Sequence, residues 1–151
     1  MQLSTKGRYA VMAMVDLARQ SCAQATAPCR AVSLADIAAR QEISLAYLEQ
    51  LFARLRRAGL VTSVRGPGGG YRLTLPPAET RVSAIIHAVD EPMAVTRCGG
   101  HVAAGCMTAG AKCLTHDLWE ALGDEIDGFL SRVSLEDVVQ RRVRARSQIA
   151  A

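Results

Sequence analysis

The sequence has no uninterrupted apolar run of the roughly 18 residues that a membrane-spanning helix needs. Its N-terminus, from Met1 to Lys6, also lacks the apolar core of a signal peptide. We therefore expect a cytoplasmic protein that has no membrane partner. In that compartment five cysteines, an odd number, are expected to be thiols or metal ligands rather than a disulfide framework.

The sequence also lacks the fingerprints of catalysis. No GK[ST] follows its glycine-rich run, and we find no oxyanion-hole or cofactor-binding motif. Cys113 and His116 could in principle serve as nucleophile and base, but nothing else in the sequence supports that interpretation. We predict that the protein is not an enzyme.

Half of the residues are hydrophobic, so the chain is expected to fold. The net charge of +4, from 18 basic and 14 acidic residues, supports nucleic-acid binding only weakly by itself. The order of the residues is more informative than their totals.

The first part of the sequence predicts three helices followed by a β-hairpin. Ser4 is a candidate cap for the first helix, and Ser33 with Asp36 is a candidate capping box for the second. After a three-residue connection, Ser44 can cap a third helix, which Gly59 would end in a left-handed conformation. Two short helices across such a turn are typical of a helix-turn-helix, and the second is the candidate reader of the DNA major groove.

The hairpin that follows is predicted from two β-prone runs, 60–64 and 71–75. Between them, residues 65–70 contain four glycines and one proline, which allows an unusual backbone conformation. A basic hairpin directly after a recognition helix is typical of the wing of a winged helix-turn-helix. An ordinary surface hairpin is the alternative, and a phosphate-binding nucleotide loop is less favoured because no helix begins at the glycines.

Polar side chains follow the outward face of the third predicted helix. Glutamine can pair with adenine, a carboxylate can accept from cytosine N4, and arginines mostly clamp phosphates or favour the helix dipole. A solvated polar face is the alternative for any single residue. With the wing included, the candidate DNA-binding residues are Tyr47, Glu49, Gln50, Arg54, Arg57, Arg65, Gly66, Pro67 and Arg72.

A candidate metal site lies within 19 residues and consists of Cys98, Cys106, Cys113 and His116. The gaps between these residues are seven, six and two residues long. Thiolates bind iron–sulfur clusters and zinc alike, and the spacing lies near that of CCCH zinc fingers. Such fingers usually have three residues before the histidine and aromatic side chains that stack on bases, and this segment has neither. The residues alone leave a cluster, zinc and, less favoured, inert thiols or a disulfide open.

A long helix is expected from residue 117 onward, and Ser134 with Asp137 is a capping box for a short helix after it. Because the long helix carries the single tryptophan and one of two phenylalanines, we favour a two-fold dimer interface over a core helix. The candidate interface residues recur at helical spacing and are Trp119, Leu122, Ile126 and Phe129.

The predicted fold class is mainly α with a small β-hairpin wing, in which a winged helix-turn-helix precedes a long C-terminal dimerisation helix. The predicted domains are a DNA-binding domain (1–80), a connector helix (81–97), a cluster-binding loop (98–116), the dimerisation helix with the short helix (117–140), and a basic, disordered tail (141–151).

Several segments of the sequence resemble the IscR family of iron–sulfur cluster regulators. The resemblance runs in order from Met1 to about Val139 and is carried by the segments Leu3–Val11, Ile43–Phe52, Val64–Tyr71, Ala88–Glu91, Thr96–Cys98 and Lys112–His116. It implies a homodimeric winged-helix transcription factor that binds double-stranded promoter DNA. It further implies a [2Fe-2S] cluster on Cys98, Cys106, Cys113 and His116, whose occupancy controls genes of iron–sulfur cluster assembly.

Three alternatives remain beside this interpretation. The gaps between the cysteines are longer here than in better-known family members, and His101 in the first gap is the alternative ligand to Cys106. A structural zinc, or a sensor of nitric oxide or redox state on the same fold, would use the same residues. Cys22 and Cys29 lie outside the set and are expected to be small packing residues.

Overall fold

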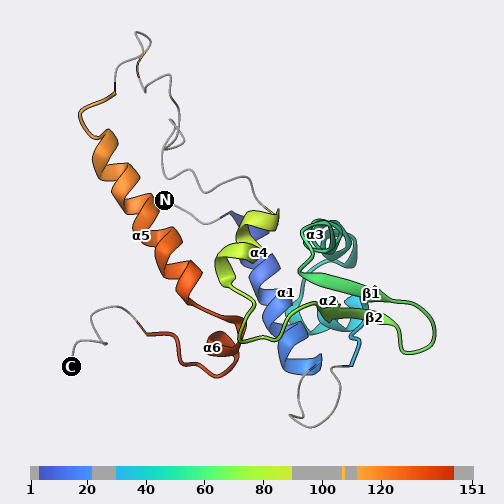
Figure 1. The fold of residues 1–151 in the computed structure, drawn as a ribbon. Helices are drawn as coiled ribbons and strands as arrows, with labels where there is room; N and C mark the ends of the chain where they lie inside the picture. The colour runs from blue at the N-terminus through green and yellow to red at the C-terminus, as the bar shows by residue number, and fades with distance from the viewer. Residues whose placement is uncertain (1–3, 22–29, 90–106, 108–111, 145–151) are drawn as a thin grey trace.

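The structure is a computed structural model, and it describes residues 4–21, 30–89, 107 and 112–144. The described residues are mainly helical with one two-stranded antiparallel sheet, which confirms the predicted fold class (Figure 1). The elements in chain order are α1 (Thr5–Ser21), α2 (Leu34–Gln41), α3 (Leu45–Arg57), β1 (Val61–Val64), β2 (Gly70–Leu73), α4 (Val82–Val89), α5 (His116–Arg132) and α6 (Leu135–Val139).

Serine side chains begin the first three helices, as predicted. Ser4, Ser33 and Ser44 each accept a hydrogen bond from the backbone N–H three residues further on, at 3.1, 3.1 and 3.2 Å. Each bond satisfies one of the backbone donors that the first turn of a helix leaves without a partner.

The end of α3 explains how the chain turns into the wing. Gly59 has a φ of +75°, its N–H donates to the carbonyl of Arg56, and the N–H of Leu60 donates to that of Leu55, both at 3.0 Å. These two bonds form a Schellman motif, whose left-handed residue is usually glycine. The predicted end of the recognition helix at Gly59 is confirmed.

The wing pairs β1 with β2 in a register that runs from Val61 opposite Leu73 to Val64 opposite Gly70. Val32, just before α2, adds a short third pairing, because it exchanges backbone hydrogen bonds of 3.0 and 2.8 Å with Tyr71. Gly70 makes this approach possible: a Cβ atom there would lie 2.2 Å from the Val32 carbonyl oxygen.

One buried cluster unites α1, α2, α3, the wing, α4 and α6, which together we call the head. At its centre Phe52 is fully buried and packs edge-on against Tyr71, with ring centroids 4.9 Å apart. Ile85 of α4 and Leu135 of α6 belong to the same cluster and are fully buried. The core of the head therefore includes residues beyond 80, while the division into domains stays a prediction.

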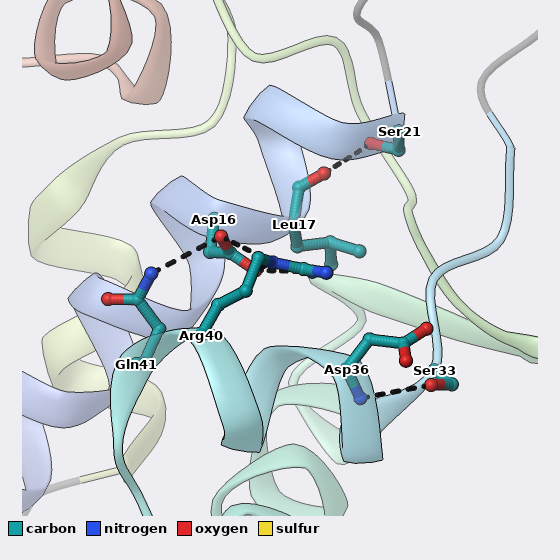
Figure 2. A network of polar contacts seen from close by, with 7 residues as sticks. All are labelled: Asp16, Leu17, Ser21, Ser33, Asp36, Arg40 and Gln41. Atoms are coloured by element: carbon teal, nitrogen blue, oxygen red, sulfur yellow. Dashed lines mark hydrogen bonds and ion pairs between the residues drawn. The ribbon is translucent and has the colours of Figure 1, made fainter.

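A buried ion pair joins α1 to α2, and sequence patterns did not predict it. The Asp16 side chain is 5% exposed and accepts hydrogen bonds from the Arg40 guanidinium at 2.7 to 3.1 Å (Figure 2). Gln41 donates a further bond of 3.2 Å to the same carboxylate. The hydrogen bonds that Arg40 donates to Asp16 raise the pKa of Arg40 above its ordinary value.

The predicted capping box at the start of α6 is confirmed. Ser134 accepts from the N–H of Asp137 at 3.1 Å, and the Asp137 carboxylate accepts from the Ser134 hydroxyl and N–H at 2.6 and 3.0 Å. These bonds to the charged form lower the pKa of Asp137.

Helix α5 extends away from the head as a long arm (Figure 1). It contacts the head through α4: the Ser131 hydroxyl donates to that of Ser83 at 3.1 Å, and His87 Nε2 lies 3.0 Å from Asp127 Oδ1. Of the residues in α5, His116 alone is buried.

Candidate DNA interface and ligand-bearing segment

The outward ridge of α3 is formed by side chains on the face opposite its buried one. Leu48, Leu51 and Phe52 lie on the buried face. Gln50 and Arg57 are exposed and seven residues apart, so they share one face two turns apart. We call them, with the adjacent and exposed Glu49, the outward ridge, and we note that they belong to the predicted DNA-binding set.

Two other predicted DNA-binding residues, Tyr47 and Arg54, contact other helices of the head. Tyr47 is half-buried and packs edge-on against Tyr9 of α1, with ring centroids 6.0 Å apart. Arg54 is exposed, but its Nη1 donates a 2.8 Å hydrogen bond to the carbonyl of Val89 at the end of α4. Both side chains are thus held by other helices of the head.

The wing carries the remaining predicted DNA contacts. Arg65, Gly66, Pro67 and Arg72 are all exposed. Since β1 begins four residues after α3 ends, the wing and the recognition helix lie next to each other in the head (Figure 1). The arrangement offers cations and bare backbone next to α3, which suits a phosphate backbone.

Two of the four candidate metal ligands lie within the described residues, at the start of α5. His116 is the first residue of α5, is 5% exposed, and donates its backbone N–H to the carbonyl of Cys113 at 3.0 Å. Cys113 is half-buried, and its Sγ lies 3.8 Å from Thr115 Oγ1. The other candidate ligands and unassigned cysteines lie outside the described residues; they are Cys98, Cys106, His101, Cys22 and Cys29.

The donor set at this position fits an iron–sulfur cluster and also zinc, because both accept thiolate and imidazole ligands. A carboxylate that sequence analysis missed lies close by: Glu120 Oε2 is 3.9 Å from His116 Nε2, one helical turn along α5. Asp117 completes a group of three possible donor atoms within 4.8 Å of one another. The four-residue spacing from His116 to Glu120, which places both on one face of a helix, is the sequence signal that could have identified this pair.

The predicted dimer residues lie on α5. Trp119 is 40% exposed, and Leu122, Ile126 and Phe129 are half-buried. Leu118 beside them is 61% exposed. The helix thus presents apolar side chains that the described part of this chain covers incompletely.

Comparison with known proteins now assigns the family. The family model Rrf2, described as an iron-dependent transcriptional regulator, matches residues 3–141. The chain belongs to the Rrf2 family of transcriptional regulators. Its match includes the helix-turn-helix, the wing, the ligand-bearing segment and α5.

Named relatives of this Rrf2 regulator support the resemblance to IscR. It is 54% identical to the HTH-type transcriptional regulator IscR of Photorhabdus laumondii over 94% of this chain and 81% of that protein. It is 52% identical to the IscR of Enterobacter sp. over 94% of this chain and 82% of that protein. The resemblance stated from sequence segments is confirmed.

Solved structures agree with this assignment. The structure of T. potens IscR matches with a TM-score of 0.73 and 34% identity, covering all of this chain and 93% of that one. CymR, the global cysteine regulator of B. subtilis, matches with a TM-score of 0.75 and 30% identity, over 93% and 98% of the two chains.

The Rrf2 assignment also bears on two negative predictions. The relatives are named as transcriptional regulators, which agrees with the prediction that this chain is not an enzyme. Among the helices that the structure describes, none is long and apolar enough to cross a membrane.

Proposed function

We propose that this Rrf2 regulator is a cytoplasmic homodimer that reads promoter DNA and senses iron–sulfur cluster or iron status. It would hold a [2Fe-2S] cluster and control genes of iron–sulfur cluster assembly. The observation that carries the proposal is the position of Cys113 and His116, which lie just before and at the first residue of α5, the described helix that extends away from the head.

The proposed cluster ligands are Cys98, Cys106, Cys113 and His116. These ligands would form a site that a cluster occupies when clusters are plentiful and leaves when they are scarce. One imidazole among the thiolates would raise the reduction potential of the bound cluster. The near-complete burial of His116 supports its assignment, because a ligand held away from solvent competes less with water.

The proposed DNA surface is the outward ridge of α3 together with the wing. Glu49 and Gln50 are exposed where base edges would meet the recognition helix, and the arginines of the wing would meet phosphates. Two such surfaces in a dimer would read two half-sites at a fixed spacing.

The proposed dimer interface is the apolar side of α5. Its residues are too exposed to be explained by the described core of the head, and a two-fold pairing of two α5 helices would cover them. Trp119 is the expected anchor, since tryptophan is enriched among the residues that dominate interfaces.

Analysis of iron and acid-labile sulfide in protein purified without oxygen tests the cluster directly. We expect two irons and two sulfides per chain, with the visible absorption of a thiolate-bound ferric cluster. Cys106→Ala should abolish this absorption, and His101→Ala should leave it unchanged. Zinc without sulfide in protein that resists reconstitution would refute the proposal and leave a DNA-binding protein with a structural metal.

Sedimentation of Trp119→Asp tests the dimer. We expect the wild type to sediment as a dimer and the variant as a monomer, because a charge in an apolar interface is costly. Leu75→Asp is the matched control, since Leu75 is 46% exposed but follows the wing rather than lying on α5. A dimer that persists in Trp119→Asp would exclude this part of α5 as its centre.

A further inference from the structure

Arg54 makes an unexpected contact for a residue of a recognition helix. Its Nη1 donates a 2.8 Å hydrogen bond to the carbonyl of Val89, which is fully buried and ends α4. The last carbonyls of a helix have no partner within the helix and carry the negative end of its dipole. A guanidinium satisfies both needs, so Arg54 acts as a cap that joins α3 to the end of α4.

Arg54 borders the outward ridge, because it lies four residues after Gln50 and three before Arg57, but its guanidinium bonds to the end of α4. Arg54 lies seven residues after Tyr47, so the two share a side of the helix. Tyr47 packs on Tyr9 of α1, and Arg54 reaches α4, so this side of α3 is held by the head. Arg54 therefore differs from its surface neighbours Gln50 and Arg57 in its bond to the Val89 carbonyl, and not in its position around the helix.

Helix α4 lies between the recognition helix and the arm. At its end it receives the Arg54 guanidinium, and along its length it contacts α5 through Ser83 and His87. In the sequence, the residues that follow Val89 lead directly to the first proposed ligand, Cys98. Two of the chain segments that leave or contact α4 therefore carry the proposed ligands.

We propose that Arg54 is a positioning residue that links the recognition helix to α4, and through it to the ligand-bearing parts of the chain, rather than a phosphate clamp. The link to the ligands rests on the function proposed above. A change in the position of the end of α4 would move or break the Arg54 bond and thereby alter how α3 is presented to DNA. Arg54 would then affect DNA affinity without touching DNA.

The salt dependence of DNA binding distinguishes a positioning residue from a phosphate clamp. The plot of log K for DNA binding against log salt concentration has a negative slope, and each lost phosphate contact reduces the magnitude of this slope by about 0.9. We would measure binding to a fluorescent duplex of random sequence by anisotropy, for the wild type, Arg54→Gln and the matched variant Arg57→Gln. Both variants remove one positive charge near the end of α3, but among the residues that the structure describes the guanidinium of Arg57 bonds to the Ala53 carbonyl of its own helix and to no other helix.

We expect Arg57→Gln to reduce the magnitude of the slope by about 0.9, the value of one phosphate contact, and Arg54→Gln to leave the slope unchanged. An equal fall in both variants would overturn the assignment of Arg54 and make it a phosphate clamp. Circular dichroism establishes that each variant is folded at the assay temperature. If Arg54→Gln does not fold, Arg54→Met, which keeps the apolar stem, takes its place with the same expected slope.

The link to the ligands is tested by the ratio of DNA affinities of the cluster-loaded protein and its His116→Ala variant. The probe is a duplex selected from a random library by the loaded wild type. We expect a wild-type ratio in the range of typical allosteric coupling, about 5-fold to 150-fold, and a ratio near one when Arg54→Gln is present. Arg57→Gln should weaken both affinities and keep the wild-type ratio.

The two possible failures are distinguishable. A wild type without a cluster would refute the proposed function, and the salt slopes would still decide whether Arg54 touches phosphate. A loaded protein in which Arg54→Gln keeps the full wild-type ratio would overturn the link through Arg54 and leave the proposed function intact.

Discussion

Replacing Arg40 with alanine should destabilise the head by about 2 kcal/mol. The change leaves the Asp16 carboxylate, which is 5% exposed, with the single hydrogen bond from Gln41. Breaking a fully buried ion pair costs about 3–5 kcal/mol. The Arg40 side chain is 36% exposed, so solvent already screens part of its attraction to Asp16, and we lower the expected value accordingly.

The assay is urea unfolding followed by circular dichroism, for Arg40→Ala, Asp16→Ala and the double variant. Because the two side chains touch, their effects should not add: we expect an interaction energy of about 1–2 kcal/mol in the double-mutant cycle. The matched control is Arg142→Ala, which breaks exposed pairs with Glu136 at 3.0 Å and with Asp137 at 3.7 Å. Its effect should stay within about 0.5 kcal/mol.

Two results would refute this reasoning. If Arg40→Ala costs no more than Arg142→Ala, burial of Asp16 does not strengthen the pair. If the two single changes are additive, the bond does not link α1 to α2 energetically, and the contact drawn in Figure 2 contributes nothing to holding the helix-turn-helix on α1.

Three further predictions concern the wing, the capping box of α6 and the outward ridge. Gly70→Ala should lower the free energy of unfolding, measured in urea, by at least about 2 kcal/mol, because its Cβ would meet the Val32 carbonyl oxygen at 2.2 Å. Gly68 is also at positive φ but has open space around it, so Gly68→Ala should cost only about 1 kcal/mol. Similar losses in the two variants would show that the backbone around Gly70 relaxes to admit the Cβ. Asp137 has a lowered pKa, so its stabilising effect is present above the ordinary carboxyl pKa and is lost as the pH falls through the lowered value. The urea midpoint of the wild type should therefore exceed that of Asp137→Asn at pH 7, and the two should converge in strong acid. Gln50→Ala should change which bases a selected duplex contains and cost about 1–3 kcal/mol on the wild-type site, while leaving the salt slope unchanged; a uniform loss on all sequences would contradict a role in base reading.

Features that depend on neighbours in the chain could be predicted from the sequence. The serine caps of the first three helices, the end of α3 at Gly59 and the capping box at Ser134 each involve residues within a few positions of one another. Their signals are therefore complete in a short window of sequence. The wing was predicted for the same reason, and its strands lie within two residues of the expected runs.

Features that depend on distant partners could not be predicted in this way. Asp16 and Arg40 are 24 residues apart, and Arg54 and Val89 are 35 apart, so no local pattern marks either contact. Helical spacing predicts that Gln50 is exposed on α3, but it does not show which residues beside Gln50 contact α1 and α4. Sequence reasoning therefore grouped Arg54 with the outward arginines, and only the packing of the helices separates them.

The side-chain contacts between α5 and α4 contribute a free energy that is similar in size to a typical coupling between two sites. The His87–Asp127 pair is half-exposed on both sides, and such pairs contribute about 0–1 kcal/mol. The Ser131–Ser83 hydrogen bond adds about 1 kcal/mol. These two side-chain contacts together contribute about 1–2 kcal/mol, which is comparable with the 1–3 kcal/mol of a typical coupling between two sites. Two further bonds hold the base of α5, from Arg81 to the Arg132 carbonyl and from the Val82 N–H to the Val133 carbonyl. A coupling free energy of that size at the start of α5 would offset the two side-chain contacts along α4, whereas the fully buried core of the head would resist the same displacement.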